Sequence, residues 1–81
     1  MDRAAVQAGA FAHARAALAA LSPRERDVVA SIGQGRSNTE IAKALDMTLA
    51  TVKTHVSHIL TKLGLDNRTQ IALLAHDAGL I

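Results

Sequence analysis

The stretch TLATVKTHVSHILTKLGL, residues 48–65, has the pattern of a single amphipathic helix with an unusual polar side. Its apolar residues follow one another at steps of four, three and four, which places them on one side of an α-helix; they are Val52, Val56, Ile59 and Leu63. The opposite side carries hydroxyl groups, lysines and histidines, and the whole stretch contains no acidic residue. Thr48 is a favourable N-cap and Gly64 suits the left-handed position after a helix end, so the pattern predicts a helix over about residues 49–63.

Two serine–glutamate pairs before this stretch are spaced as capping boxes and predict two further helix starts; they are Ser22 with Glu25 and Ser37 with Glu40. Pro23 suits the first helical position, and we expect the first of these helices to end at GQG, residues 33–35. The second is expected to end near Leu45, and residues 46–48 then form a short turn. Two helices joined by so short a turn form a helix-turn-helix, in which one side of the pair faces away from the core.

The two ends of the chain also have helical patterns. Asn67 is a favourable N-cap for a last helix over about residues 68–78, and residues 1–20 are dominated by alanine, the best helix former. We expect residues 1–20 to be a helical linker or an extra N-terminal helix, with a frayed start as the alternative. The sequence therefore predicts an all-α chain, in which a compact four-helix helix-turn-helix domain over residues 21–81 follows an Ala-rich linker.

The composition excludes several classes of function. The 81 residues are enough for one small domain, and the absence of cysteine excludes disulfides, thiolate metal sites and a cysteine nucleophile. No Tyr or Trp is present to stack on single-stranded nucleic acid. A paired nucleophile and base and a Gly-rich phosphate loop are also missing, so we expect neither an enzyme nor a cofactor. The sequence has no apolar run long enough to span a membrane and no secretory signal pattern, so we expect a cytoplasmic protein.

The distribution of charge is more informative than the net charge of +2. Residues 22–47 carry four basic and four acidic side chains, whereas residues 48–65 carry two lysines and no acid. Such an element favours a polyanion as partner. His55 and His58 are three positions apart, but we expect no metal site, because no cysteine or acid lies in the same helix to complete a ligand set.

Three segments, in this order, resemble the LuxR/NarL/FixJ-type DNA-binding domain; they are LSPRERDVV (21–29), GQGRSNTEIAKAL (33–45) and TVKTHVSHILTKLGL (51–65) followed by NR (67–68). The similarity covers about residues 21–79. It implies a domain of four helices, whose third enters the major groove of double-stranded DNA and whose fourth pairs two copies. Many members are effector domains of two-component response regulators. Ser31 and Gly33 stand where the family usually has a larger aliphatic residue and an alanine, so we expect a looser first helix.

The outward side of the helix over 49–63 supplies three candidates for contact with base edges. Lys53 can donate to O6 or N7 of guanine, and Thr54 can contact the methyl group of thymine. Ser57 is shorter than the side chains that family members often carry at this position, so a water-bridged contact is expected there. The alternative for all three residues is an ordinary solvated helix side.

Seven residues are candidates for contact with DNA phosphates, because they lie in the first turn of that helix, along its sides, or beside the preceding helix, which by the resemblance crosses the DNA backbone; they are Arg36, Asn38, Thr48, Thr51, His55, His58 and Lys62. Three alternatives stay open. Thr48 can be a plain N-cap, His55 can pack against a neighbouring helix, and Lys62 can be a solvated charge. Local ion pairs are the alternative for the arginines of PRERD.

The last helix has a second stripe of small or apolar residues beside the one that should face the core; it consists of Thr69, Ala72, Leu73, His76 and Leu80. By the resemblance this stripe is the contact of a homodimer, which we expect to be weak in isolation. Scattered exposed leucines are the alternative.

Two hypotheses of function follow. The leading one is sequence-specific binding of double-stranded DNA by the domain of a transcriptional regulator, as a dimer. The alternative is a protein-interaction module that reuses the helix-turn-helix fold, for instance to dock RNA polymerase or an antagonist. The absence of acid from residues 48–65 argues against the alternative, because a protein partner would not require it.

Overall fold

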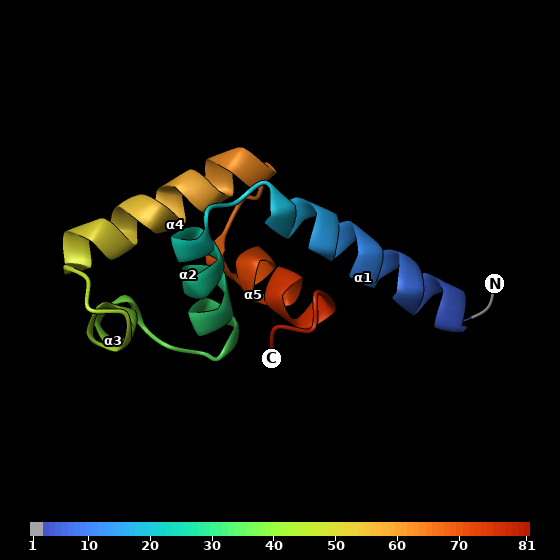
Figure 1. Cartoon of the computed structure of the whole chain (residues 1–81), viewed down its shortest axis with the longest axis horizontal. Helices are drawn as coiled ribbons and strands as arrows, with labels where there is room; N and C mark the ends of the chain where they lie inside the picture. The colour runs from blue at the N-terminus through green and yellow to red at the C-terminus, as the bar shows by residue number, and fades with distance from the viewer. Residues whose placement is uncertain (1–2) are drawn as a thin grey trace.

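The computed structural model describes residues 3–81, with side chains from residue 9 onward, and within these residues the chain forms five α-helices and no strand (Figure 1). The helices are α1 (Arg3–Ala19), α2 (Pro23–Gly33), α3 (Asn38–Ala44), α4 (Leu49–Leu63) and α5 (Arg68–Asp77). The predicted all-α fold is confirmed, and the helix expected over 49–63 has the bounds of α4. Residues 1 and 2 of the expected linker lie outside the described residues.

The helices begin where local capping groups satisfy their free N–H groups. At the start of α2, the Ser22 hydroxyl accepts from the Glu25 N–H at 3.2 Å, and the Glu25 carboxylate accepts from the Ser22 N–H at 2.9 Å. The same reciprocal pair is present before α3. Thr48 and Asn67 each accept from the N–H three positions later, at 3.1 Å. The capping signals in the sequence therefore set all four helix starts after residue 20.

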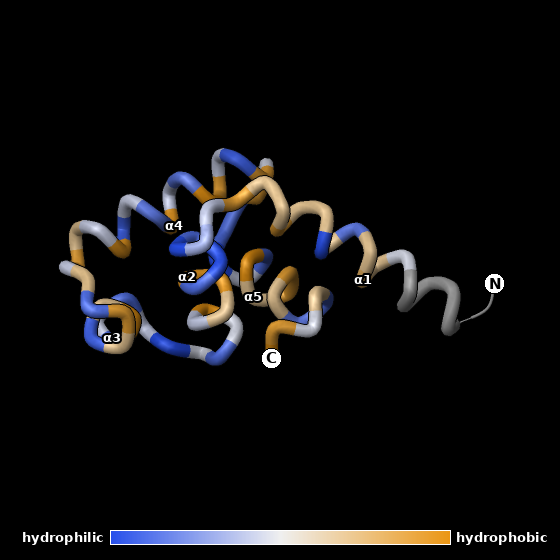
Figure 2. The backbone as a smooth tube through the Cα atoms, in the orientation of Figure 1, coloured by the Kyte–Doolittle hydropathy of each residue, from blue (hydrophilic) through white to orange (hydrophobic). Residues whose placement is uncertain are grey.

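The core is aliphatic, and α2 lies at its centre between α4 and α5 (Figure 1). Its six largest completely buried side chains come from four different helices: Val28, Val29, Ile41, Val52, Ile59 and Ile71. Along α4 the hydrophobic residues lie on the side toward α2 and the hydrophilic ones on the outer side (Figure 2). Burial of these side chains holds α4 on the domain and leaves its polar side outside.

The α1 helix extends beyond the bundle from the loop that leads into α2 (Figure 1). Its last turns join the core, because Ala14 and Leu18 are buried there together with Leu21 of the connecting loop. Farther from the bundle, Phe11 is 46% exposed, and the Arg15 guanidinium lies 5.3 Å from the centre of its ring. The C-terminal half of α1 is therefore an integrated part of the fold.

The close contact between α2 and the C-terminal segment gives Gly33 a packing role. A Cβ atom at this position would lie 2.6 Å from Cβ of Ala75 and 2.1 Å from Cδ1 of Ile81. Both distances are far shorter than a van der Waals contact, so α2 and α5 approach each other here as only glycine allows. The expected loosening of α2 stays a prediction. The close packing explains why a glycine stands at position 33, which the family resemblance did not suggest.

Candidate nucleic-acid interface

The helices α3 and α4 form the helix-turn-helix that the sequence predicted, with α3 lying across the N-terminal end of α4 (Figure 1). The chain turns through Asp46, which has a left-handed φ of 54°, and the Met47 N–H donates to the Ala42 carbonyl at 2.9 Å. Aspartate tolerates this conformation better than most residues. Ile41 of α3 and Val52 of α4 are completely buried against the core. The pair is therefore rigidly placed, and the opposite side of α4 is open.

The open side of α4 presents the three candidates for base contact on successive turns. Lys53, Thr54 and Ser57 are all exposed. No acidic residue lies in α4, and Lys53 makes no ion pair with any described residue. A surface of this kind can lie among phosphates without charge repulsion, and its short side chains allow close approach to a groove.

The threonine hydroxyls on this side are already partly engaged within the helix. The Thr54 hydroxyl donates to the Ala50 carbonyl at 3.0 Å, and the hydroxyl oxygens of Thr48 and Thr51 lie 2.9 Å apart. A hydroxyl has one proton, so Thr54 offers a partner only its methyl group and acceptor lone pairs. This geometry favours contact with a thymine methyl or a base amino group over contact with a guanine acceptor.

The candidates for phosphate contact lie around this surface and differ in how exposed their side chains are. Arg36, Thr48, Thr51 and His58 are exposed, whereas Asn38 and His55 are half-buried. Thr48 is also the N-cap of α4, so the N-cap interpretation is confirmed, and its phosphate contact stays a prediction. The described residues contain no group of three or more side chains that could hold a metal ion.

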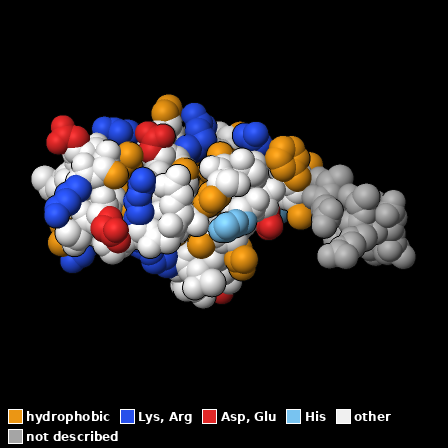
Figure 3. Space-filling view, turned by 90° about the horizontal axis from the view of Figure 1, so that it is seen from below, with side chains coloured by type: hydrophobic (Ala, Val, Ile, Leu, Met, Phe, Trp, Pro, Cys, Tyr) orange, Lys and Arg blue, Asp and Glu red, His pale blue; other side chains and the backbone are white. Residues whose placement is uncertain are grey.

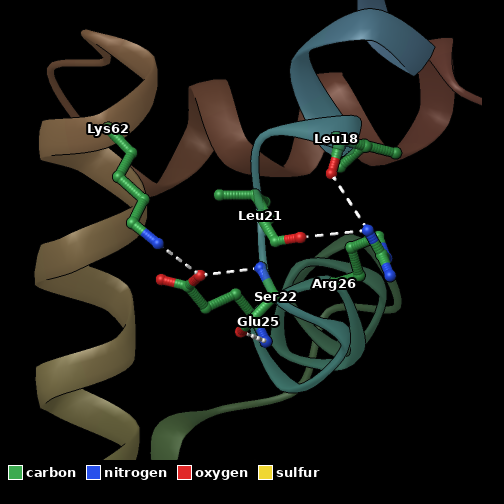
Figure 4. Close-up of polar contacts among 6 residues, drawn as sticks. All are labelled: Leu18, Leu21, Ser22, Glu25, Arg26 and Lys62. Atoms are coloured by element: carbon green, nitrogen blue, oxygen red, sulfur yellow. Dashed lines mark hydrogen bonds and ion pairs between the residues drawn. The ribbon is translucent and has the colours of Figure 1, made fainter.

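Lys62 is held by a partner that the sequence did not indicate (Figure 4). Its ammonium lies 2.8 Å from the Glu25 carboxylate, whose side chain is only 4% exposed. The hydrogen bond from Lys62 and the one from the Ser22 N–H lower the pKa of Glu25 from 4.5 to about 2, against the opposing effect of burial. Because the charge of Lys62 is already paired with a carboxylate of the same domain, it is the phosphate candidate that the geometry favours least.

Two arginines near the start of α2 donate hydrogen bonds to backbone carbonyls of other segments. Arg26 donates to the carbonyl of Leu18 in the last turn of α1, at 3.5 Å, and to that of Leu21 in the connecting loop, at 3.0 Å (Figure 4). Arg24 donates to the Leu45 carbonyl at the end of α3, at 3.0 Å, and lies 3.7 Å from Asp27. The local ion pair, which was the alternative for these arginines, is therefore present for Arg24, while the carbonyl contacts fix α1 and α3 relative to α2.

No role for Arg68 was predicted from the sequence, although it directly follows the N-cap of the last helix. Its Nη1 donates to the side-chain oxygen of Asn38, and its Nη2 donates to the Arg36 carbonyl at 2.6 Å. These partners are 30 and 32 residues away, so no local pattern could have paired them. Arg68 thus connects the start of α5 to the segment that carries two phosphate candidates.

The stripe expected to form a dimer contact on α5 is only partly open. Leu73 is 57% exposed, and Thr69 and His76 are exposed as well. Ala72 and Leu80 are half-buried and pack against the core of the same chain. Seen from below, Lys and Arg side chains are spread over the bundle, and exposed hydrophobic side chains become more frequent toward α1 (Figure 3). A contact on α5 would therefore be small and centred on Leu73.

The fold defines a helix-turn-helix protein in which the exposed side of α4 carries no acidic residue. Residues 19–75 match the family of bacterial regulatory proteins described as the luxR family. The chain therefore belongs to the LuxR family, and it is a DNA-binding domain of a transcriptional regulator.

Individual relatives agree with this assignment. The transcriptional regulatory protein YhcZ of Bacillus subtilis is 54% identical over 68% of this chain, and the nitrate/nitrite response regulator NarL of Escherichia coli is 48% identical over 69%. Full-length FixJ from B. japonicum superposes on 99% of the chain with a TM-score of 0.81 and 30% identity. The chain spans 26% of the length of YhcZ and of NarL and 39% of that FixJ chain. None of the described helices is long and apolar enough to cross a membrane.

Proposed function

We propose that this chain binds operator DNA as the effector domain of a two-component response regulator, with α4 in the major groove. The observation that carries the proposal is the open, acid-free side of α4 within a rigid helix-turn-helix. Its relative NarL is a response regulator by name, and the chain corresponds to about a quarter of its length.

Base recognition in this proposal depends mainly on Lys53. Its long, unpaired side chain can donate to guanine, whereas Thr54 and Ser57 are short. Thr54 contributes its methyl group, and Ser57 acts through a water molecule. Specificity then depends in part on DNA shape and on a second half-site, because few side chains reach the bases.

Backbone contacts are assigned to the groups that surround α4. The first turn of α4, with Thr48 and Thr51, meets one strand through hydroxyl and N–H groups. Arg36 and Asn38 meet the backbone from the side of α3, and His55 and His58 from the flanks of α4. Two copies joined through the stripe centred on Leu73 place two such helices about one DNA turn apart.

The test compares the DNA affinity of a variant that lacks the Lys53 ammonium with that of a variant that lacks a remote charge. Binding to a duplex selected by the wild-type chain is measured by fluorescence anisotropy at several salt concentrations. Lys53→Ala is expected to weaken binding by about tenfold or more. Arg15→Gln removes one charge from α1, at the other end of the molecule from α3, and is expected to have little effect.

Equal affinity and salt dependence for wild type and Lys53→Ala would show that α4 is not the element in the groove. If the wild-type chain shows no salt-dependent binding to duplex DNA, the alternative of a protein-interaction module on the same fold takes its place.

A further inference from the structure

Arg68 connects the start of α5 to the start of α3, where the proposed backbone contacts Arg36 and Asn38 lie. It lies in the first turn of α5, the helix that carries the proposed dimer stripe, and it is half-buried. Both terminal nitrogens of its guanidinium are used inside the domain, one on the side chain of Asn38 and one on the carbonyl of Arg36. The planar guanidinium fixes the directions of both bonds at once.

The contact with Arg68 determines which way the Asn38 carboxamide points. An arginine side chain can only donate hydrogen bonds, so the atom facing it must be the carboxamide oxygen, and the NH₂ group must point elsewhere. No described residue accepts from this NH₂ group, and no side-chain nitrogen or oxygen in the described residues is both buried and without a partner. The NH₂ group is therefore accessible from solvent, with its two protons free.

We propose that Arg68 is a positioning residue for DNA binding, which holds the Asn38 carboxamide so that its NH₂ group donates to a DNA phosphate. The inference rests on the proposed function, since it requires Asn38 to meet the backbone. Without Arg68 the carboxamide would turn freely and present its oxygen, a poor partner for phosphate, as often as its NH₂ group. Arg68 also donates to the Arg36 carbonyl, but this main-chain contact does not orient the Arg36 side chain, so the proposal concerns Asn38 alone.

A double-mutant cycle separates positioning from a direct contact of Arg68 with DNA. Arg68→Gln and Asn38→Ala are each expected to weaken binding to the selected duplex, by about three- to tenfold. The double variant is expected to bind no more weakly than Asn38→Ala alone, because Arg68 has nothing left to position. Additive losses would overturn the inference.

The salt dependence of binding gives a second, independent measure. If Arg68 neutralises no phosphate, the slope of log K against log salt should be the same for wild type and Arg68→Gln. A slope that falls by about one unit would show that the guanidinium itself contacts DNA, and would overturn the positioning role. Arg15→Gln, which removes the same charge from α1, is the matched control.

Asn38→Asp tests the same inference without removing the link to Arg68. The carboxylate still accepts from Arg68, now as a charge-assisted bond, so the urea midpoint of unfolding should be unchanged or higher. The second oxygen replaces the NH₂ group, so DNA affinity should fall by about tenfold or more through repulsion of phosphate. Gln34→Glu, the same change of amide to acid on an exposed residue at the end of α2, should cost much less. Equal losses of DNA affinity for Asn38→Asp and Gln34→Glu would show that any added negative charge has this effect. That result would overturn the inference.

Failure of this inference is distinguishable from failure of the proposed function. If Lys53→Ala loses binding while Asn38→Ala and Asn38→Asp keep it, the domain binds DNA through α4 and the role of Arg68 is wrong. If the wild-type chain selects no duplex, both fail together.

Discussion

The ion pair between the buried Glu25 and the exposed Lys62 allows a quantitative prediction for Glu25→Gln. Glutamine keeps the size of the side chain and can still accept from the Ser22 N–H, so the change mainly removes the negative charge that faces Lys62. A pKa lowered from 4.5 to about 2 corresponds to about 3 kcal/mol of stability at neutral pH. Lys62 is 46% exposed, so water screens its part of the interaction, and we expect a loss of about 1–2 kcal/mol.

The sign of the pH dependence follows from the direction of the shift. The pKa of Glu25 is lower in the folded state, so folding favours the ionised carboxylate. The stabilisation is complete above the ordinary pKa of 4.5 and is lost as the pH falls from there toward 2. The difference in unfolding free energy between wild type and Glu25→Gln should therefore be largest near neutral pH and should shrink in acid.

Urea unfolding followed by far-UV circular dichroism measures this difference, since the chain has no Trp or Tyr for fluorescence. Asp27→Asn is the control, because Asp27 lies on the same helix, is 54% exposed and pairs only loosely with Arg24. It should cost less than about 0.5 kcal/mol. Equal stability of wild type and Glu25→Gln at pH 7, or a difference that does not change with pH, would refute the reasoning.

Three other substitutions test separate parts of the structure. Gly33→Ala should destabilise by about 0.5–2 kcal/mol in urea unfolding, because the clash with Ala75 exceeds the gain in helix propensity; a more stable variant would show that α2 and α5 are not in such close contact. Thr54→Val should keep affinity for a site with thymine at that position, because the hydroxyl proton is already used within α4; a tenfold loss in anisotropy titrations would assign the hydroxyl a direct role. Leu73→Ala should leave folding within about 0.5 kcal/mol of wild type and weaken binding to an inverted repeat but not to a single half-site; equal losses on both would contradict a dimer contact.

The parts of the fold that the sequence predicted correctly depend on interactions between near neighbours. A capping residue and its partner are three positions apart, so Ser22, Ser37, Thr48 and Asn67 indicated their helix starts directly. The apolar period of α4 identified the side that packs on the core. The family resemblance added what periodicity alone cannot supply, the role of the outward side.

The interactions that the sequence did not predict join residues far apart in the chain. Lys62 and Glu25 are 37 positions apart, and Arg68 and Asn38 are 30 apart, so each pair forms only because helix packing brings the two side chains together. The same holds for Leu80, which helical geometry placed on an outward stripe but which packs against the core of its own chain. Tertiary packing determines which of these side chains meet or become buried, and a helical wheel contains no information about tertiary packing.

The central claim is that the outward side of α4 recognises a DNA sequence. Selection of duplexes from a random pool by the wild-type chain and by Lys53→Ala, followed by sequencing, tests it most directly. The wild-type chain is predicted to enrich one half-site motif containing a guanine, repeated in inverted orientation about one turn apart, and Lys53→Ala is predicted to lose the preference for that guanine. The same motif enriched by both chains, or no motif enriched by the wild type, would contradict the claim.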